Sequence, residues 1–420
     1  MYKKILLSKY FTFILFSLIG VVLSMFFSKQ MDTFNYMFGK EIIVLFLPSF
    51  FVVLFYTING FLSGFSNKIF ILSLFLFLVI CIPFWGQVFK IVQPNKGDDF
   101  EKTFFFTKNM IQNKTLWGGD QLLFKEAGKS YVMQPGFRYF VAVELLIFKE
   151  LYRFISVLNL FLFISALFFL QKTIDHLINN KTLKILLFLL VILSMPYATK
   201  NILMGLSEWL AVFFLIGSVY FYLYRNNLFL ALVFLAIIPF IRQNTLPITM
   251  IVFMIYTLKS RLKLSYLISF IAILLLPLYH NLYYAGEWRF FTSVFEWPFL
   301  NYGNSSTSVK ATDISVSHLL NNITHYIGFD FKNGYIDFME ESFLFLWLFI
   351  FLFIYMGRQI ASKYGRYFYY LTSIFLVLVP GILLATDYYP RFEFVNAYLI
   401  LAVFLITYKF DREHIFSLRA

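Results

Sequence analysis

Long apolar runs dominate this sequence of 420 residues. Most of them are about 16 to 20 residues long, and short polar breaks separate them. An apolar helix of about that length crosses the hydrocarbon core of a bilayer, which is about 30 Å thick. Transmembrane barrel strands would be shorter segments in which apolar and polar residues alternate, and the sequence shows no such alternation. The runs therefore predict an all-α polytopic membrane protein.

The composition points to the same class. The chain is 60% hydrophobic and 14% charged, whereas a soluble globular chain is about half apolar and a quarter charged. Its one cysteine, Cys81, lies inside an apolar run. The sequence therefore contains neither a disulfide framework nor a thiolate metal site.

We predict about 12 transmembrane helices in a single transmembrane domain, residues 1–420, with no separate soluble domain. The first helix is expected to be retained rather than cleaved as a signal peptide, because it lacks a small-residue cleavage signature. Pro239 and Pro247 interrupt the seventh and eighth spans, so the boundaries near 228–258 are not fixed by the sequence. The expected spans are 10–27, 41–59, 69–86, 153–171, 183–198, 205–224, 228–243, 246–258, 264–284, 342–357, 367–385 and 393–408.

The basic residues indicate how the spans are oriented. The formal charge is +13, but the Lys and Arg residues are scattered over the gaps between spans instead of forming one patch, which argues against a nucleic-acid partner. In a twelve-span count, the short basic gaps all fall on one side, as the positive-inside rule requires. Both termini are therefore expected in the cytoplasm. Two long polar segments, about 87–152 and 285–341, are expected on the outer face.

The first of these outer segments begins with a cluster of carboxylates. Asp98, Asp99 and Glu101 lie within four residues, just past a predicted span. A partly desolvated carboxylate there could have its pKa raised toward that of a general base. Alternatively, Asp98 and Glu101 have the spacing of a capping box, which would only start an interfacial helix. The two interpretations are compatible, and both stay open.

A second motif near the end of the same segment is Gln134-Pro-Gly136, followed by Phe137, Arg138, Tyr139 and Phe140. The Pro-Gly turn predicts the start of an amphipathic aromatic helix, with Arg138 close to its beginning. An arginine at an outer membrane interface can extend harmlessly toward water. It can also bind a phosphate.

Together, the motifs resemble GT-C glycosyltransferases, in particular bacterial membrane proteins similar to the dolichyl-phosphate-mannose protein mannosyltransferases. The resemblance extends from about residue 90 to residue 400. Two departures are Gln134-Pro-Gly, where many relatives have Pro-Pro, and three predicted spans before the Asp pair instead of one. The tail is also too short for the soluble C-terminal domain of some relatives. The residues that carry the resemblance are Asp98-Asp99, the Pro-Gly motif, Gly205-Leu-Ser-Glu208, Ile241-Arg242-Gln-Asn244, His280-Asn-Leu-Tyr-Tyr-Ala-Gly286 and Asp387-Tyr-Tyr-Pro-Arg391-Phe392.

The resemblance implies an inverting membrane glycosyltransferase. The donor would be a polyprenyl-phosphate-linked sugar held beside the membrane lipid, and the acceptor a lipid, glycan or protein. The location would be the bacterial inner (plasma) membrane, with the active site facing outward, in the assembly of a cell-envelope glycan. Asp98 or Asp99 would be the catalytic base. The expected substrate-binding residues are Glu101, Arg138, Tyr139, Glu208, Arg242, His280 and Arg391.

The chemistry of individual residues supports parts of this assignment. An arginine between apolar runs, such as Arg242, is costly unless it is paired, and Glu208 is a candidate partner. Arg391 could bind phosphate or extend toward the interface. His280 stands where a metal ligand could, although a lone histidine at a helix end more often forms structural hydrogen bonds. No metal ligand is predicted. Carboxylates suit Mg²⁺ or Mn²⁺, so a divalent ion at Asp98, Asp99 and Glu101 stays an alternative.

Two other functions also fit a chain of this kind. An O-antigen polymerase or ligase has about as many spans and a large outer loop, and it uses Arg and His instead of an Asp pair. A transporter or flippase would place charged residues and broken helices in the middle of the bilayer. The charges of this sequence lie at the predicted membrane faces instead.

Overall fold

In the computed structural model, the described residues form an all-α bundle, apart from one very short pair of strands. Two-residue strands β1 (Phe329–Asp330) and β2 (Tyr335–Ile336) pair antiparallel, with Phe329 opposite Ile336. The structure describes residues 104, 107–108, 111–112, 135–149, 151–180, 182–184, 186–187, 198, 201–202, 205–242, 245–260, 262–285, 288, 329–330, 335–336, 343–384 and 390–413.

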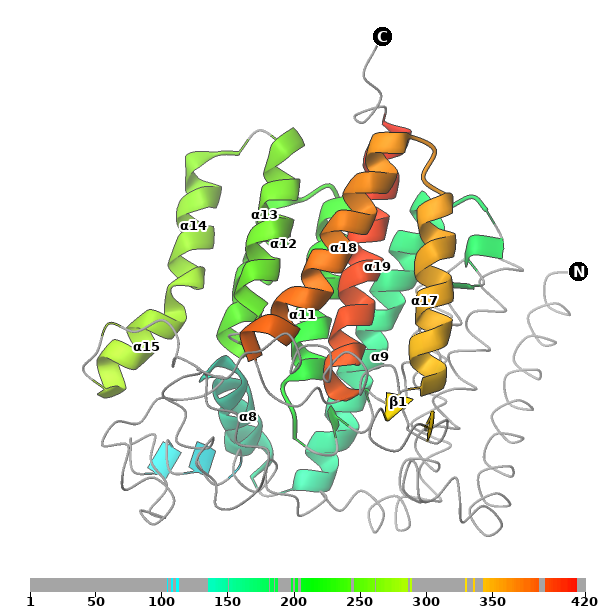
Figure 1. Ribbon diagram of the computed structural model, residues 1–420. Coiled ribbons are helices and arrows are strands. Elements are labelled where there is room, and N and C mark those ends of the chain that lie inside the picture. Colours follow the sequence, from blue (N-terminus) through cyan, green and yellow to red (C-terminus); the bar gives the residue numbers. More distant parts are fainter. Residues whose placement is uncertain are drawn as a thin grey trace, which may run out of the picture.

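Helices occupy the predicted positions throughout the described part of the chain (Figure 1). The helices are α8 (Pro135–Phe148), α9 (Tyr152–Leu177), α11 (Glu208–Leu223), α12 (Leu228–Ile241), α13 (Leu246–Lys259), α14 (Leu264–Leu274), α15 (Leu276–Ala285), α17 (Phe343–Arg358), α18 (Lys363–Leu384) and α19 (Pro390–Arg412). The predicted spans 10–27, 41–59 and 69–86, and most of 183–198, lie outside the described residues.

The sequence predicts one span over 264–284, but the structure divides this segment at Leu275 into two helices, α14 and α15. Pro277 explains the break. Its ring lacks an N–H and would clash with the carbonyl of residue 273 in a continuous helix. The amides of Leu278 and Tyr279 both bond to the Leu275 carbonyl instead, which starts the new helix. The two helices run in different directions in Figure 1.

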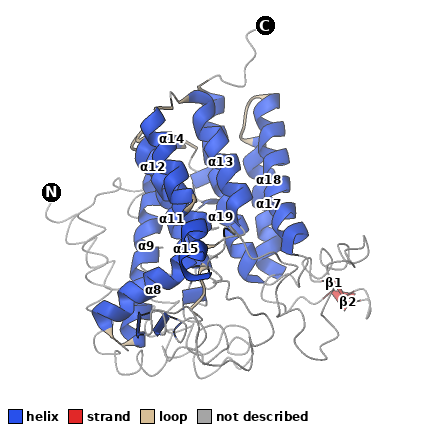
Figure 2. Ribbon diagram, turned by 90° about the vertical axis from the view of Figure 1, so that its left-hand side faces the viewer, coloured by secondary structure: helices blue, strands red, loops and turns tan. Residues whose placement is uncertain are grey.

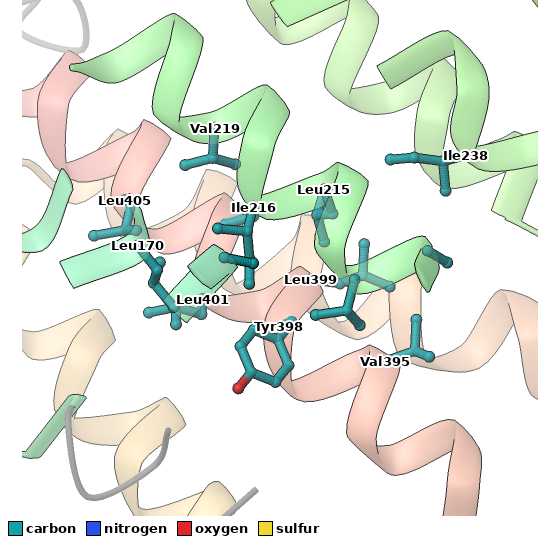
Figure 3. Packing of buried hydrophobic residues seen from close by; sticks show 14 of the residues in the cluster. Leu170, Leu215, Ile216, Val219, Ile238, Val395, Tyr398, Leu399, Leu401 and Leu405 are labelled. Atoms are coloured by element: carbon teal, nitrogen blue, oxygen red, sulfur yellow. The ribbon is translucent and has the colours of Figure 1, made fainter. Parts of the chain in front are cut away.

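Helix α11 lies in the middle of the bundle and contacts α9, α12 and α19. Most of its residues are buried, which is expected of a helix that is apolar on all sides. Figure 3 shows Leu215, Ile216 and Val219 of α11 facing Leu399 and Leu401 of α19, with other apolar side chains around them. This contact between helices far apart in sequence is part of the core, to which α9 and α12 also contribute.

The basic turns of the bundle gather at one end, which we call the basic end (Figure 1, top). It consists of the ends of α9, α11, α13, α17 and α19 and the starts of α12, α14 and α18. Charged side chains of α19 bind three other segments there. Arg412 donates to the Leu177 carbonyl (2.7 Å), Lys409 donates to Asn226 (3.2 Å), and Asp411 accepts from the Ala361 and Ser362 amides. The other basic residues there are Lys172, Lys184, Arg225, Lys263, Arg358, Lys363 and Arg366.

Exposed apolar side chains line the outer helices. Leu264, Ile268 and Ile271 follow one face of α14, and Leu371 and Ile374 lie on α18. Within the described residues, one segment, Leu158–Leu177, is both long and apolar enough to span a membrane. Glu208–Leu223, Leu228–Ile241 and Leu264–Leu274 are apolar but shorter. The all-α class is confirmed for the described residues, and the number of about 12 spans stays a prediction.

Candidate functional site

The end of the bundle opposite the basic end brings together several predicted site residues. We call it the site end, and it consists of α8, α15, the start of α11 and the end of α12 (Figures 1 and 2). Helix α8 packs against α9, α12 and α15. It begins at Pro135, as the Pro-Gly motif predicts. Residues from four separate segments therefore meet there.

A buried ion pair joins the start of α11 to the end of α12. The Nη1 atom of Arg242 lies 2.8 Å from Oε1 of Glu208, and the two side chains are 6% and 0% exposed. The same nitrogen donates a hydrogen bond to the Ser207 hydroxyl at 3.2 Å. Arg242 has Glu208 as its partner, as the cost of an unpaired charge between apolar runs requires. The pair joins the end of α12 to the start of α11, and the substrate-binding roles of Glu208 and Arg242 stay a prediction.

A second polar contact joins α8 to α15. The Tyr139 hydroxyl lies 2.9 Å from Nδ1 of His280, and their rings meet edge to face. The Arg138 charge acts on the His280 ring electrostatically. Burial lowers the pKa of Arg138 to about 9, so this guanidinium keeps its charge at neutral pH. Three of the predicted substrate-binding residues therefore form one cluster, the Tyr139 cluster (Arg138, Tyr139 and His280).

Phe240 connects the Tyr139 cluster to the ion pair. Its ring stacks on Tyr139 with 5.7 Å between the centroids, and Arg242 follows two residues later. On the other side of α8, Phe140 lies edge-on to Trp209, the residue after Glu208. These aromatic contacts could not be predicted from local patterns, because each joins residues about 70 or more positions apart.

The close approach of α8 to α12 depends on Gly136. A Cβ atom there would lie 2.6 Å from the Phe240 ring and 2.8 Å from the Phe240 carbonyl oxygen. The carbonyl oxygen belongs to the backbone, so no side-chain rotation can relieve this clash. We expect Gly136→Ala to destabilise the protein by about 1–3 kcal/mol and to push α8 away from α12. Melting of the purified protein would measure the loss. Val143→Ala on the exposed face of α8 is the control, with an expected change within about 0.5 kcal/mol. Equal melting of the two variants would contradict the prediction.

Glu144 is a titratable residue of the site end that sequence reasoning missed. Its side chain is on the buried face of α8, and the residue is 4% exposed. Neither carboxyl oxygen has a hydrogen-bond partner, and the same is true of Oδ1 of Asn159 on α9. Burial raises the pKa of Glu144 to about 8, and the nearby Asn159 side chain offsets part of the rise. A single carboxylate inside the apolar run Val141–Phe148 was the available signal.

The remaining predicted residues are not placed at the site end. Asp98, Asp99 and Glu101 lie outside the described residues, as does the side chain of Arg391. The backbone of Arg391 is in the first turn of α19. The described residues include no group of three or more His, Cys, Asp or Glu side chains that could hold a metal ion. The Mg²⁺ or Mn²⁺ alternative concerns carboxylates outside that part of the chain.

The site end combines a cationic group, a hydrogen-bonded Tyr–His pair and a fixed ion pair. Arginine suits a phosphate because its planar group donates two parallel hydrogen bonds. Arg138 lies in the Tyr139 cluster, and Arg242 faces Glu208 at 2.8 Å. No family model matches this chain, and neither curated proteins nor solved structures include one significantly similar to it, so its function is argued from the site alone.

Proposed function

We propose that this protein is an inverting membrane glycosyltransferase that uses a polyprenyl-phosphate-linked sugar. The observation that carries the proposal is the convergence of Arg138, Tyr139 and His280 beside the Glu208–Arg242 pair. This convergence lies at the end of the bundle opposite the basic turns. Helix α8 also directly continues the predicted outer segment that contains Asp98 and Asp99.

Two features support the membrane location and the orientation. The exposed side chains of α14 and α18 include large apolar residues, which a lipid environment accommodates. Basic residues gather at the opposite end, and cytoplasmic loops are rich in Lys and Arg. With the basic end in the cytoplasm, the site end faces outward. The membrane would be the inner (plasma) membrane of a bacterium.

The reaction needs a base, a cation for the leaving group and a place for the lipid chain. The acceptor hydroxyl attacks the anomeric carbon while its proton passes to Asp98 or Asp99. The bond from that carbon to the phosphate oxygen breaks, and its electrons stay on the phosphate. Arg138 stabilises the departing lipid phosphate. Glu208 and Arg242 act as positioning residues, because their ion pair joins the start of α11 to the end of α12.

Loss of the aspartates tests the proposal directly. We expect Asp98→Asn or Asp99→Asn, whichever removes the base, to lower sugar transfer by about 100- to 10,000-fold. The attacking hydroxyl then has no carboxylate to take its proton. Transfer from a radiolabelled polyprenyl-phosphate sugar to envelope glycan would be measured in membranes with equal protein content. Asp175→Asn is the matched control, because Asp175 pairs with Lys184 near the opposite end of the bundle. Full activity in both aspartate variants would refute the assignment.

The Tyr139 cluster gives one observation in favour of a second function. An O-antigen polymerase or ligase uses Arg and His, and Arg138 and His280 interact in this structure. An activity that survives loss of both aspartates but not Arg138→Gln or His280→Gln would favour this second function. Loss in the aspartate variants would favour the first.

A further inference from the structure

The buried contact between α8 and α9 contains three oxygen acceptors without a donor. They are both carboxyl oxygens of Glu144 and Oδ1 of Asn159, and within the described chain none of them has a hydrogen-bond partner. The residues are 4% and 6% exposed, so bulk water does not solvate them fully. An acceptor buried without a donor is costly, and an unpaired buried carboxylate is more costly still.

A proton on Glu144 resolves the mismatch. A neutral carboxyl group has an O–H that can donate, and the Asn159 amide oxygen can accept it. Neutral Glu144 also avoids placing a charge among the apolar side chains around it. Those neighbours include Phe140 one turn earlier, which packs on the fully buried Trp209. Ionisation would restore the mismatch and add an uncompensated charge.

The described groups around α8 do not supply another charge partner for Glu144. On α9, the described titratable side chains, Lys172, Asp175 and His176, lie toward the other end of the helix. The side chains of Tyr152 and Arg153 at its start lie outside the described residues. The end of α12 offers Arg242, which is paired with Glu208 of α11. Helix α15 offers His280, which contacts Tyr139. The other described charged groups of this segment are Arg138, near the start of α8, and the exposed Lys149 just after its end.

Glu144 is on the helix that carries Arg138 and Tyr139, about two turns farther along. We propose that Glu144 and Asn159 form a proton-binding site, and that the bound proton positions α8 and its Arg138 and Tyr139 side chains against the bundle. When the proton leaves, the carboxylate draws water or a cation into the α8–α9 contact and α8 loosens. Glu144 is therefore a positioning residue whose ligand is a proton. This inference goes beyond the proposed sugar transfer and does not depend on it.

Infrared spectroscopy of the purified protein in nanodiscs tests the proton itself. A protonated carboxyl group has a C=O stretch distinct from that of a carboxylate, and ¹³C-labelled glutamate separates Glu from Asp. We expect a glutamic acid band that disappears with a midpoint of about pH 8. The band should be absent from Glu144→Gln and unchanged in Asp175→Asn. A Glu144→Gln spectrum equal to the wild-type spectrum would overturn the inference.

Hydrogen exchange tests the positioning of α8. At pH 9, the α8 amides should exchange faster in the wild type than in Glu144→Gln, and at pH 6.5 the two should match, with α18 as the internal control. Equal α8 exchange at both pH values would overturn the positioning role. If Glu144→Gln does not fold, Asn159→Leu keeps the carboxyl group and should move the infrared midpoint, and an unmoved midpoint would contradict the shared site. None of these readouts measures sugar transfer, so they remain valid if the proposed function fails.

Discussion

Replacing Arg242 alone is expected to destabilise the protein severely. Arg242→Met removes the guanidinium that lies 2.8 Å from the carboxylate of Glu208, which is 0% exposed. Removing one member of a buried ion pair costs about 3–5 kcal/mol, because the other charge stays buried. The effect should appear as a large drop in melting temperature, and fluorescence of the neighbouring Trp209 can follow it. Arg225→Met, at an exposed position of the basic end, is the control and should change stability little.

The double variant Glu208→Leu with Arg242→Met separates the two possible roles of the pair. Replacing a buried pair by apolar residues of similar size is often neutral, so the double variant should recover most of the stability lost in Arg242→Met. If the pair only positions α11 and α12, the double variant should also keep measurable sugar transfer. A folded but inactive double variant would show that the Arg242 guanidinium takes part in the reaction. A double variant no more stable than Arg242→Met would contradict the charge-based explanation.

The second large effect is on the pH dependence of stability. Glu144 has a pKa of about 8 in the folded protein, raised by burial from 4.5. Between these values the folded state binds one proton more than the unfolded state, so stability falls as pH rises and levels off above about pH 8. Each pH unit is worth about 1.4 kcal/mol, and the whole interval therefore costs up to about 5 kcal/mol.

Glu144→Gln should remove this component of the pH dependence. We expect the melting temperature of the wild type, relative to that of the variant, to fall steadily from pH 5 to pH 8 and then to remain constant. Melting at intervals of half a pH unit would measure the difference. Asp175→Asn should follow the wild type, because its carboxylate lies at an exposed position. Parallel melting curves for wild type and Glu144→Gln would show that Glu144 is ionised in both states.

The helices could be predicted because apolar runs and their polar breaks are local signals. Eight of the predicted spans coincide with described helices or helix pairs, and Pro135 starts α8 as the Pro-Gly motif indicates. The break at Leu275 was not predicted, although Pro277 is the residue that causes it. A proline within an apolar run is compatible with one span, but here it divides the run into two helices.

The site could be predicted only in part, because side-chain partners are chosen by tertiary packing. Glu208 was identified as a candidate partner of Arg242 because two isolated charges between apolar runs are expected to meet. The contact of Tyr139 with His280, 141 positions later, depends on how α8 lies against α15. The burial of Glu144 could not be predicted, because it depends on which face of α8 lies against the bundle. The placement of Asp98 and Asp99 stays a prediction.

The three contacts of α19 at the basic end have a consequence for biosynthesis. Lys409, Asp411 and Arg412 bind the turn between α11 and α12, the turn between α17 and α18, and the end of α9. The ribosome makes α19 after all of these segments. During translation, the earlier segments therefore lack these hydrogen bonds until α19 is made. The bonds from α19 to all three segments then form in one late step.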